Sequence, residues 1–174
     1  MTHLFQTIDT PDGPFTAVAR EDGAVLASGW TASVAEALAR VRAASRPGDV
    51  REGALAAVDA VRAFYAGDPA PAMDVPVDLH GTDGQLAGWA ALRRIPAGNP
   101  LSYTEFAREL GNPRAVRAAA AVCARNPVAL FVPCHRVLRA DGSLGGFAWG
   151  EDVKQRLLDR EAARPARGSG GSEG

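Results

Sequence analysis

The chain has 174 residues, a formal net charge of −1 and 47% hydrophobic residues, which is ordinary for a globular protein of one or two small domains. No stretch approaches the roughly 20 apolar residues that span a bilayer, and the opening MTHLFQTIDTPDG lacks the pattern of a secretory signal. With two cysteines, Cys123 and Cys134, a disulfide scaffold is excluded, and we expect a cytoplasmic protein with reduced thiols.

The charge is unevenly distributed along the chain. Residues 1–92 carry six basic and twelve acidic side chains, whereas residues 93–139 carry eight arginines and two glutamates. A basic block in a near-neutral protein predicts either a surface for a polyanion such as nucleic acid or a solvated, arginine-rich face. The acidic balance of the first half argues that this half does not itself hold DNA.

Residues 1–76 are predicted to form an N-terminal domain of a β-meander followed by helices. Three short apolar runs are broken by Pro-Asp-Gly and Glu-Asp-Gly, which favour tight turns. A helix should begin at Ser33, with Glu36 completing a capping box. A second helix within residues 51–68 would bury one face, formed by Leu55, Val58, Val61, Phe64 and Tyr65. The proline-rich stretch 69–81 is the expected linker.

Residues 77–163 are predicted to form a second, mostly helical domain. Its first helix, GQLAGWAALRRI, should stop at Pro96 and bury a face formed by Trp89, Leu92 and Ile95. Gly84 and Gly88 lie in this helix, and each costs about 1 kcal/mol relative to alanine. Because they also remove side chains from the core, we expect compensation nearby or modest stability.

The next two helices make a helix-turn-helix candidate. In SYTEFARELGN, Ser102 is the expected N-cap, Glu105 occupies the matching capping position, and Gly-Asn ends the helix. Pro113 should restart a helix, RAVRAAAAVCAR, in its first turn. Small side chains would let this helix approach a nucleic-acid backbone, and its arginines would supply charge. An ordinary helical hairpin in a core has the same pattern.

The remaining segment combines an apolar run with a glycine-rich loop. Asn126-Pro127 ends the preceding helix, residues 128–132 are expected to form a short buried strand, and Pro133 ends that strand. A turn is expected at Asp141-Gly142. The last helix, EDVKQRLLDREAA, has acidic residues in its first turn and basic residues toward its end, which suits the helix dipole. The Gly/Ser-rich residues 164–174 are expected to be disordered.

Cys134 precedes His135 directly, and the residues alone leave three interpretations of this pair. A free cysteine is usually a buried, inert core residue. A metal site is disfavoured, because adjacent Cys and His chelate one ion poorly and the sequence has no C-x-x-C or H-x-x-x-H spacing. The third interpretation is a thiolate activated by a neighbouring imidazole, directly or through water.

The stretch PCHRV, at its distance after Asn126-Pro127 and behind the two-helix candidate, resembles the O6-alkylguanine-DNA alkyltransferase family, the methylated-DNA–protein-cysteine S-methyltransferases. The similarity covers nearly the whole chain, including TIDTPDGPFTAVA, DLHGTDGQLAGWAALRRIPAGNPLSYTEFA and KQRLLDRE. It implies an α/β (α+β) fold without a cofactor or metal. It also implies a monomer that binds the minor groove of double-stranded DNA, flips out O6-alkylguanine, and transfers the alkyl group irreversibly to Cys134. O4-alkylthymine stays open as a second substrate.

The resemblance also implies a role for each matching residue. Cys134 would attack the alkyl carbon, His135 would take the thiol proton through a water, and Glu161 would orient that histidine. Tyr103 would give a proton to guanine N3, and Asn126 would tie the recognition helix to the active-site loop. Each residue alone has an ordinary structural explanation, such as a core tyrosine or a surface glutamate. Their shared order and spacing carry the assignment.

The resemblance places two further groups of residues at the DNA. Arg117 would enter the base stack and fill the gap of the flipped nucleotide. The other contacts with DNA would come from Arg114, Ala118, Ala121, Arg136 and Tyr103. The guanine pocket would be lined by Val137, Gly145, Phe147, Ala148 and Trp149. Phe147 departs from the commoner tyrosine of the pocket loop, so a hydroxyl is lost while a stacking face is kept.

Two other functional classes remain open at this stage. A non-catalytic lesion sensor of the same fold would lack the cysteine, so Cys134 argues against that class. A plain helix-turn-helix regulator is disfavoured by the acidic first half and by the lack of a clear dimerisation segment.

Overall fold

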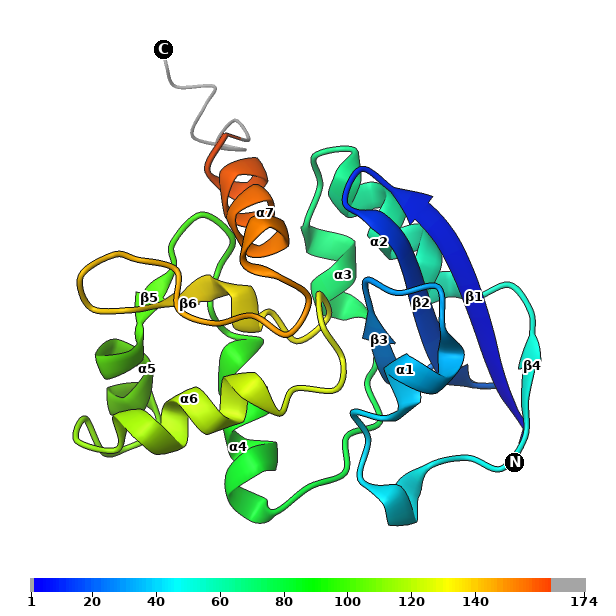
Figure 1. Ribbon diagram of the computed structural model, residues 1–174, viewed down its shortest axis with the longest axis horizontal. Coiled ribbons are helices and arrows are strands. Elements are labelled where there is room, and N and C mark those ends of the chain that lie inside the picture. The colour runs from blue at the N-terminus through cyan, green and yellow to red at the C-terminus, as the bar shows by residue number, and fades with distance from the viewer. Residues whose placement is uncertain (1, 164–174) are drawn as a thin grey trace.

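The computed structural model describes residues 2–163, and Figure 1 shows a sheet-containing half beside a mostly helical half. Strands β1 (His3–Thr10), β2 (Gly13–Arg20) and β3 (Val25–Gly29) form the predicted antiparallel meander. Gly13 and Gly23 occupy its two turns with φ of +99° and +97°, a backbone region that favours glycine. The α/β fold class is therefore confirmed. The predicted disorder of residues 164–174 lies outside the described residues.

A fourth strand was absent from the sequence prediction. β4 (Val50–Glu52) pairs in parallel with β1, so the sheet has the order β3-β2-β1-β4. The strand has three residues, two of them charged and exposed. Such a segment carries no alternating pattern, and only its pairing with β1 defines it as a strand.

The helix expected to begin at Ser33 is shorter than predicted. α1 (Val34–Leu38) is followed by a separate 3-10 turn, η1 (Ala43–Ser45). Ser33 caps α1 by accepting a hydrogen bond from the Glu36 backbone N–H at 3.1 Å. The Glu36 carboxylate, however, accepts a hydrogen bond from the Thr31 hydroxyl rather than from the Ser33 N–H. The capping box is thus only half formed.

The second predicted helix is confirmed as α2 (Ala56–Tyr65), which buries most of the expected face. Val58, Val61 and Phe64 are buried, whereas Tyr65 is only partly buried. The predicted linker over residues 69–81 contains a short helix, α3 (Ala70–Asp74). The expectation was wrong there because proline is tolerated in the first turn of a helix.

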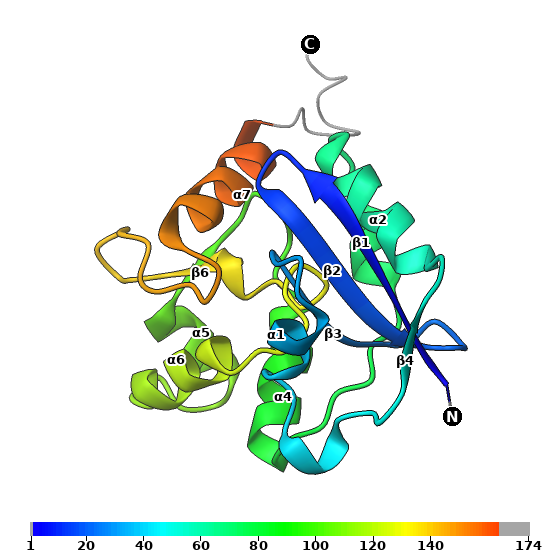
Figure 2. The ribbon, with the colours of Figure 1, turned by 45° about the vertical axis from the view of Figure 1, so that its right-hand side comes forward.

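The helical half is built from α4 (Asp83–Leu92), α5 (Tyr103–Glu109), α6 (Val116–Ala124) and α7 (Glu151–Ala163). The predicted capping box of Ser102 and Glu105 is present at α5. A small parallel pair joins β5 (Leu101–Ser102) to β6 (Val137–Leu138). Figure 2 shows α5 and α6 on the side of the molecule away from the sheet.

The second helix of the two-helix candidate begins later than predicted. Pro113 lies in a turn, and α6 starts at Val116. The Asn112 side chain holds that turn by accepting a hydrogen bond from the Arg114 backbone N–H at 3.0 Å. Asparagine side chains stabilise such turns in competition with helix formation.

Residues 128–132 are buried as expected, but they do not form a strand. Leu130 has a φ of +78°, and Val128 and Ala129 make only isolated bridge contacts. The Ser28 side chain donates a hydrogen bond to the Ala129 carbonyl at 3.0 Å. The segment is therefore a buried turn that is anchored to β3 and leads into Pro133.

The larger of the two apolar clusters among the described residues includes residues from both halves of the chain. It includes Phe15 and Val58 from the first half and Trp89, Phe106 and Phe131 from the second. The two-domain division at residues 76 and 77 stays a prediction, and the buried contacts pass across it without a break.

The two glycines of α4 have opposite surroundings. A Cβ added at Gly88 would lie 2.6 Å from Cγ1 of Val122, whereas one added at Gly84 would have no neighbour closer than 4.0 Å. Gly88 therefore permits close packing of α4 against α6, where the Trp89 indole N–H donates to the Val122 carbonyl at 2.9 Å. The Val122 side chain occupies the space that a side chain at position 88 would need, and this packing is the compensation expected for the glycine.

This contrast predicts opposite effects on stability. Gly88→Ala should lower the free energy of unfolding by about 1–3 kcal/mol through overpacking. The matched substitution Gly84→Ala should raise it by about 0.5–1 kcal/mol, because alanine restricts the unfolded chain more than glycine does. Urea unfolding of the two variants beside the wild-type protein measures both changes. Equal shifts for the two variants would contradict the packing role of Gly88.

Candidate active site

Cys134 lies in the 3-10 turn η2 (Cys134–Arg136), at the inner end of a surface cavity. The cysteine is 8% exposed, and the cavity has a volume of about 270 Å³. Side chains from both halves of the chain line it: Arg40, Tyr103, Ala120, Cys123, Ala124, Asn126, Phe147, Ala148 and Trp149. A buried thiol at the end of a small, largely apolar cavity can meet a planar molecule that enters from outside.

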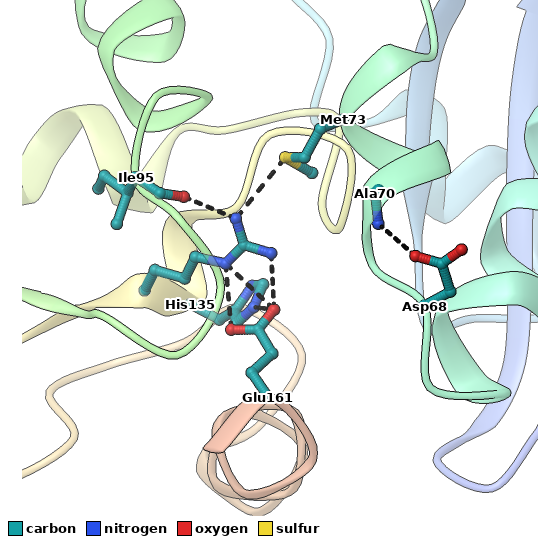
Figure 3. Close-up of polar contacts among 7 residues, drawn as sticks. Asp68, Ala70, Met73, Ile95, His135 and Glu161 are labelled. Atoms are coloured by element: carbon teal, nitrogen blue, oxygen red, sulfur yellow. Dashed lines mark hydrogen bonds and ion pairs between the residues drawn. The ribbon is translucent and has the colours of Figure 1, made fainter. Parts of the chain in front are cut away.

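His135 and Glu161 form a buried pair beside this cysteine. Figure 3 shows Glu161 extending from α7 toward His135, and their Nε2 and Oε2 atoms lie 2.9 Å apart. Burial alone would raise the pKa of Glu161, but His135 and Arg136 outweigh it and hold the pKa at about 2. The carboxylate is therefore charged at neutral pH.

The other ring nitrogen of His135 is left available. Nδ1 is buried and has no hydrogen-bond partner among the described residues. Burial lowers the pKa of His135 despite the opposing effect of Glu161, so the ring is neutral at pH 7. With the Nε2 hydrogen donated to Glu161, Nδ1 is a proton acceptor.

Arg136 was predicted to contact DNA, and that prediction is wrong. The residue is 1% exposed, and its Nη2 atom lies 2.7 Å from Oε2 of Glu161. Its Nη1 atom donates to the Ile95 carbonyl at 2.7 Å, and Figure 3 shows Ile95, Met73 and Glu161 around the same point. The guanidinium stabilises the Glu161 carboxylate from inside the protein.

The environment of Cys134 contains opposing influences on its thiol. Burial raises the pKa of Cys134, while Asn126, Lys154 and Arg40 lower it. Asn126 is itself fixed, because its Nδ2 donates to the Val132 carbonyl at 2.7 Å and its Oδ1 accepts from the Val128 N–H at 2.9 Å. The structure thus places Asn126 between the end of α6 and the turn that carries the cysteine.

Lys154 holds the loop that covers the cavity. Its Nζ donates to the carbonyls of Leu144 and Gly146, at 2.5 Å and 3.3 Å, and lies 5.9 Å from the centre of the Tyr103 ring. Tyr103 is half-buried, and burial raises the pKa of its hydroxyl to about 12. The Tyr103 hydroxyl therefore stays protonated at neutral pH and can donate a hydrogen bond into the cavity.

The predicted guanine-pocket residues divide into two groups. Phe147, Ala148 and Trp149 line the cavity together with Tyr103. Val137 does not, because it is fully buried in β6. Gly145 does not line it either; it packs against the Tyr103 ring, and an added Cβ would lie 3.2 Å from the hydroxyl oxygen.

The predicted DNA-contacting residues of α6 share one exposed surface. Arg117, Ala118 and Ala121 are exposed, and so is Arg114 in the preceding turn. The opposite side of α6 is buried through Ala119, Val122 and Cys123. A surface groove runs along the exposed side, where Ala118 and Ala121 meet α4 and the end of α5.

Sequence reasoning missed three residues at this site: Arg40, Cys123 and Lys154. For Lys154 the composition offered a signal, because it is the only lysine in a chain that also contains eighteen arginines. Arg40 comes from the segment after α1, so no local pattern connects it with the cavity. Its guanidinium lies 5.7 Å from the Trp149 ring centre.

No group of three or more His, Cys, Asp or Glu side chains suited to a metal ion occurs within residues 2–163. Over the same residues, none of the helices is long and apolar enough to cross a membrane.

Comparison with known proteins gives matches in both halves of the chain. Residues 83–163 match the family model described as the DNA-binding domain of 6-O-methylguanine DNA methyltransferase. The methylated-DNA–protein-cysteine methyltransferase of Mycobacterium bovis is 38% identical over 160 residues, which cover 92% of this chain and 93% of that protein. The bifunctional transcriptional activator/DNA repair enzyme Ada of Escherichia coli is 47% identical over 95 residues, or 55% of this chain. The chain spans about a quarter of Ada, since the match covers 27% of that protein.

Solved structures give the same relationship. The crystal structure of Mycobacterium tuberculosis O6-methylguanine methyltransferase aligns with a TM-score of 0.77 at 34% identity, covering 95% of this chain and 96% of that one. The structure of Mycobacterium tuberculosis OGT in complex with DNA aligns with a TM-score of 0.76 at 35% identity, covering 94% of each chain.

Proposed function

Because this chain belongs to the methylated-DNA–protein-cysteine methyltransferase family, we propose that Cys134 is the residue that accepts the alkyl group from O6 of a modified guanine in DNA. The observation that carries this proposal is the position of Cys134 at the inner end of the cavity, beside the buried His135–Glu161 pair. A bond forms between the sulfur and the alkyl carbon, while the bond between that carbon and O6 breaks. The product is a thioether, so each molecule acts once.

His135 activates the thiol in this proposal. Its Nδ1 is the free acceptor and takes the thiol proton through a bridging water, while Glu161 stabilises the imidazolium that forms. A thiolate is the nucleophile that displacement at carbon requires. Asn126, Lys154 and Arg40 favour that thiolate against the cost of burial.

Tyr103 completes the proton balance. The guanine that leaves would carry a negative charge, and the Tyr103 hydroxyl supplies a proton to ring nitrogen N3, so that a neutral base departs. A hydroxyl with a pKa of about 12 is protonated at the start of the reaction. Return of the imidazolium proton from His135 to the Tyr103 phenolate through solvent restores both groups, so that the net reaction moves one proton from the Cys134 thiol to guanine.

The α6 surface binds the duplex in this proposal, through the minor groove. Ala118 and Ala121 let the helix backbone approach the DNA, and Arg114 adds a positive charge. The alkyl carbon cannot be reached within a stacked duplex, so the nucleotide must flip out at a cost of a few kcal/mol. Arg117 offsets part of that cost by filling the gap. Phe147, Ala148 and Trp149 then enclose the flipped base.

The proposed reaction needs one copy of the chain, because Cys134, Tyr103 and Asn126 line one cavity and the His135–Glu161 pair comes from the same chain. The DNA substrate and a thiol that must stay reduced both favour the cytoplasm as the compartment. The proposed units are residues 1–76, which close the cavity through Arg40, and residues 77–163, which carry the reacting groups.

The direct test uses a short duplex that contains one O6-methylguanine. After incubation with the wild-type protein, intact-mass spectrometry and peptide mapping should show one added methyl group, located on Cys134. The gain should saturate at one methyl group per molecule. Binding of the damaged duplex without any mass gain would instead indicate a lesion-binding protein and overturn the proposal.

Lys154 gives a separate prediction. Lys154→Met removes the donor to the Leu144 and Gly146 carbonyls and a cation that lowers the pKa of Cys134. Single-turnover methyl transfer should slow by about 10-fold at pH 7, and the pH–rate profile should move about one unit toward alkaline pH. Lys154→Arg should keep the profile closer to the wild type. An unchanged profile for Lys154→Met would show that the lysine only supports the loop.

A further inference from the structure

A second surface hollow lies where the segment after α1 meets the end of α6. It has a volume of about 340 Å³, and four arginines and a histidine line it: Arg40, Arg42, Arg46, Arg125 and His80. We call these five residues the arginine hollow. None of the residues that line it is acidic. In Figure 1, α1 belongs to the sheet-containing half of the molecule and α6 to the mostly helical half.

Two of the four arginines already donate hydrogen bonds to backbone carbonyls around the hollow. Arg40 donates to the Ala124 carbonyl at 2.5 Å and to the Asn126 carbonyl at 3.3 Å, which covers the negative end of α6. Arg46 donates to the Val41 and Ala39 carbonyls, at 2.8 Å and 3.0 Å, and fixes the loop after α1.

The other two arginines have guanidinium groups that the described residues leave unpaired. Arg42 and Arg125 are exposed, and neither guanidinium has a hydrogen bond or an ion pair with another described residue. His80 of the hollow has its Nε2 at 3.1 Å from Oδ1 of Asp78. Asp78 is shared with Arg20 at 3.6 Å. Two unpaired guanidinium groups on a fixed backbone form a binding site for an anion.

The arginine hollow continues the surface that the proposed function assigns to DNA. Ala124 lines both the hollow and the cavity of Cys134. Arg125 lines both the hollow and the groove beside Ala118 and Ala121. An anion held here therefore lies next to a duplex on α6, and these shared residues favour a phosphodiester of that same duplex.

We infer that the arginine hollow binds backbone phosphates of the DNA beside the alkylated nucleotide, so that the first half of the chain contributes directly to the DNA interface. This inference rests on the proposed function. It reverses the expectation from net charge, because three of the six arginines of residues 1–92 gather within residues 40–46. Their local position, rather than the acidic total of that half, determines what the surface binds.

The test compares Arg42→Ala with Arg62→Ala, a matched loss of one exposed arginine from α2. Arg62 has a 56% exposed side chain that pairs only within its own helix. Fluorescence anisotropy with an undamaged duplex, measured over a series of salt concentrations, gives the affinity and its salt dependence. Arg42→Ala should weaken binding several-fold. It should also reduce the magnitude of the negative slope of log K against log salt by about 0.9, the value for one lost phosphate contact. The double variant Arg42→Ala/Arg125→Ala should reduce the magnitude of that slope by about twice as much.

The outcomes separate this inference from the proposed function. At saturating damaged duplex, Arg42→Ala should transfer the methyl group to Cys134 at the wild-type rate. Slopes for Arg42→Ala and Arg62→Ala that both equal the wild-type slope would overturn the inference and leave methyl transfer untouched. Binding of inorganic phosphate that is lost in Arg42→Ala, together with an unchanged DNA affinity of that variant, would also overturn it, since the site would then hold a free anion. A wild-type protein that binds DNA but transfers no methyl group would instead defeat the proposed function.

Discussion

Replacing Cys134 by serine should abolish methyl transfer while leaving binding to damaged DNA in place. A serine hydroxyl is a far weaker nucleophile than a thiolate, and His135 cannot ionise it to a comparable extent. The substitution exchanges sulfur for oxygen in a residue that is 8% exposed, so little volume is lost. We expect no added methyl group in the intact mass after a time that saturates the wild-type protein.

Cys123 provides the matched control for this substitution. It lies in the same cavity, is 9% exposed, and has a pKa raised mainly by burial. No histidine is adjacent to it in the sequence, and it lies on α6 rather than in η2. Cys123→Ser should therefore retain transfer of one methyl group per molecule. If Cys123→Ser lost the transfer and Cys134→Ser kept it, the assignment of the acceptor would be wrong.

Helix caps and apolar periodicity predicted those elements whose position depends on residues close together in the sequence. The caps at Ser33 and Ser102 begin helices where expected, and the apolar periodicity around Val58 and Val61 gives the buried side of α2. β4, β5 and β6 have two or three residues each. Strands of that length are defined by partners that are distant in sequence, so no pattern within them could have predicted their pairing.

The turn at residues 128–132 shows a different limit. Apolar composition predicted burial correctly, because burial follows hydrophobicity. It did not predict the backbone shape, since Leu130 adopts a φ of +78°, a conformation uncommon for residues other than glycine. The contacts of Ser28 with this segment hold the turn, and those contacts cross 101 residues of sequence.

Arg136 illustrates how position overrides charge at the site itself. The resemblance suggested a contact between Arg136 and DNA, yet the side chain is buried and paired with Glu161 of the last helix. The family resemblance placed Cys134, His135 and Glu161 in one relay, and the structure pairs His135 with Glu161 in the turn that begins at Cys134. The resemblance could not show that Arg136 is paired with the Glu161 carboxylate inside the protein.

The two halves meet at the cavity through aromatic contacts as well as through Arg40. The Trp149 ring packs against Gly29 of β3 so closely that an added Cβ would lie 2.1 Å from a ring carbon. Phe147 lies 5.9 Å from Trp30, measured between ring centres. The loop that encloses the proposed base is thus supported by the sheet, which gives the first half a structural role in the site beyond any contact with DNA.

Replacing Glu161 by glutamine should cost both stability and activity. The carboxylate is the only anion in contact with the buried His135 and Arg136 among the described residues. A neutral amide leaves the Arg136 charge buried without an opposite charge, so the free energy of unfolding should fall by about 3–5 kcal/mol. Methyl transfer should slow by about 100-fold or more, because His135 loses the group that orients it and stabilises its charged form. Glu151→Gln, an exposed change in the first turn of the same helix, should alter neither quantity appreciably.

The pH dependence of stability tests the same carboxylate without requiring the variant to fold. The pKa of Glu161 falls from 4.5 to about 2 on folding, so its contribution is fully present above pH 4.5 and is lost as the pH falls toward 2. That shift corresponds to about 3 kcal/mol. Burial also lowers the pKa of His135 from 6.5, so the unfolded chain binds a proton first and stability should begin to fall below pH 6.5. Urea unfolding of the wild-type protein between pH 7 and pH 3 should therefore show a progressive fall in the free energy of unfolding. A wild-type protein equally stable across that range would contradict a charged Glu161 at the centre of the site.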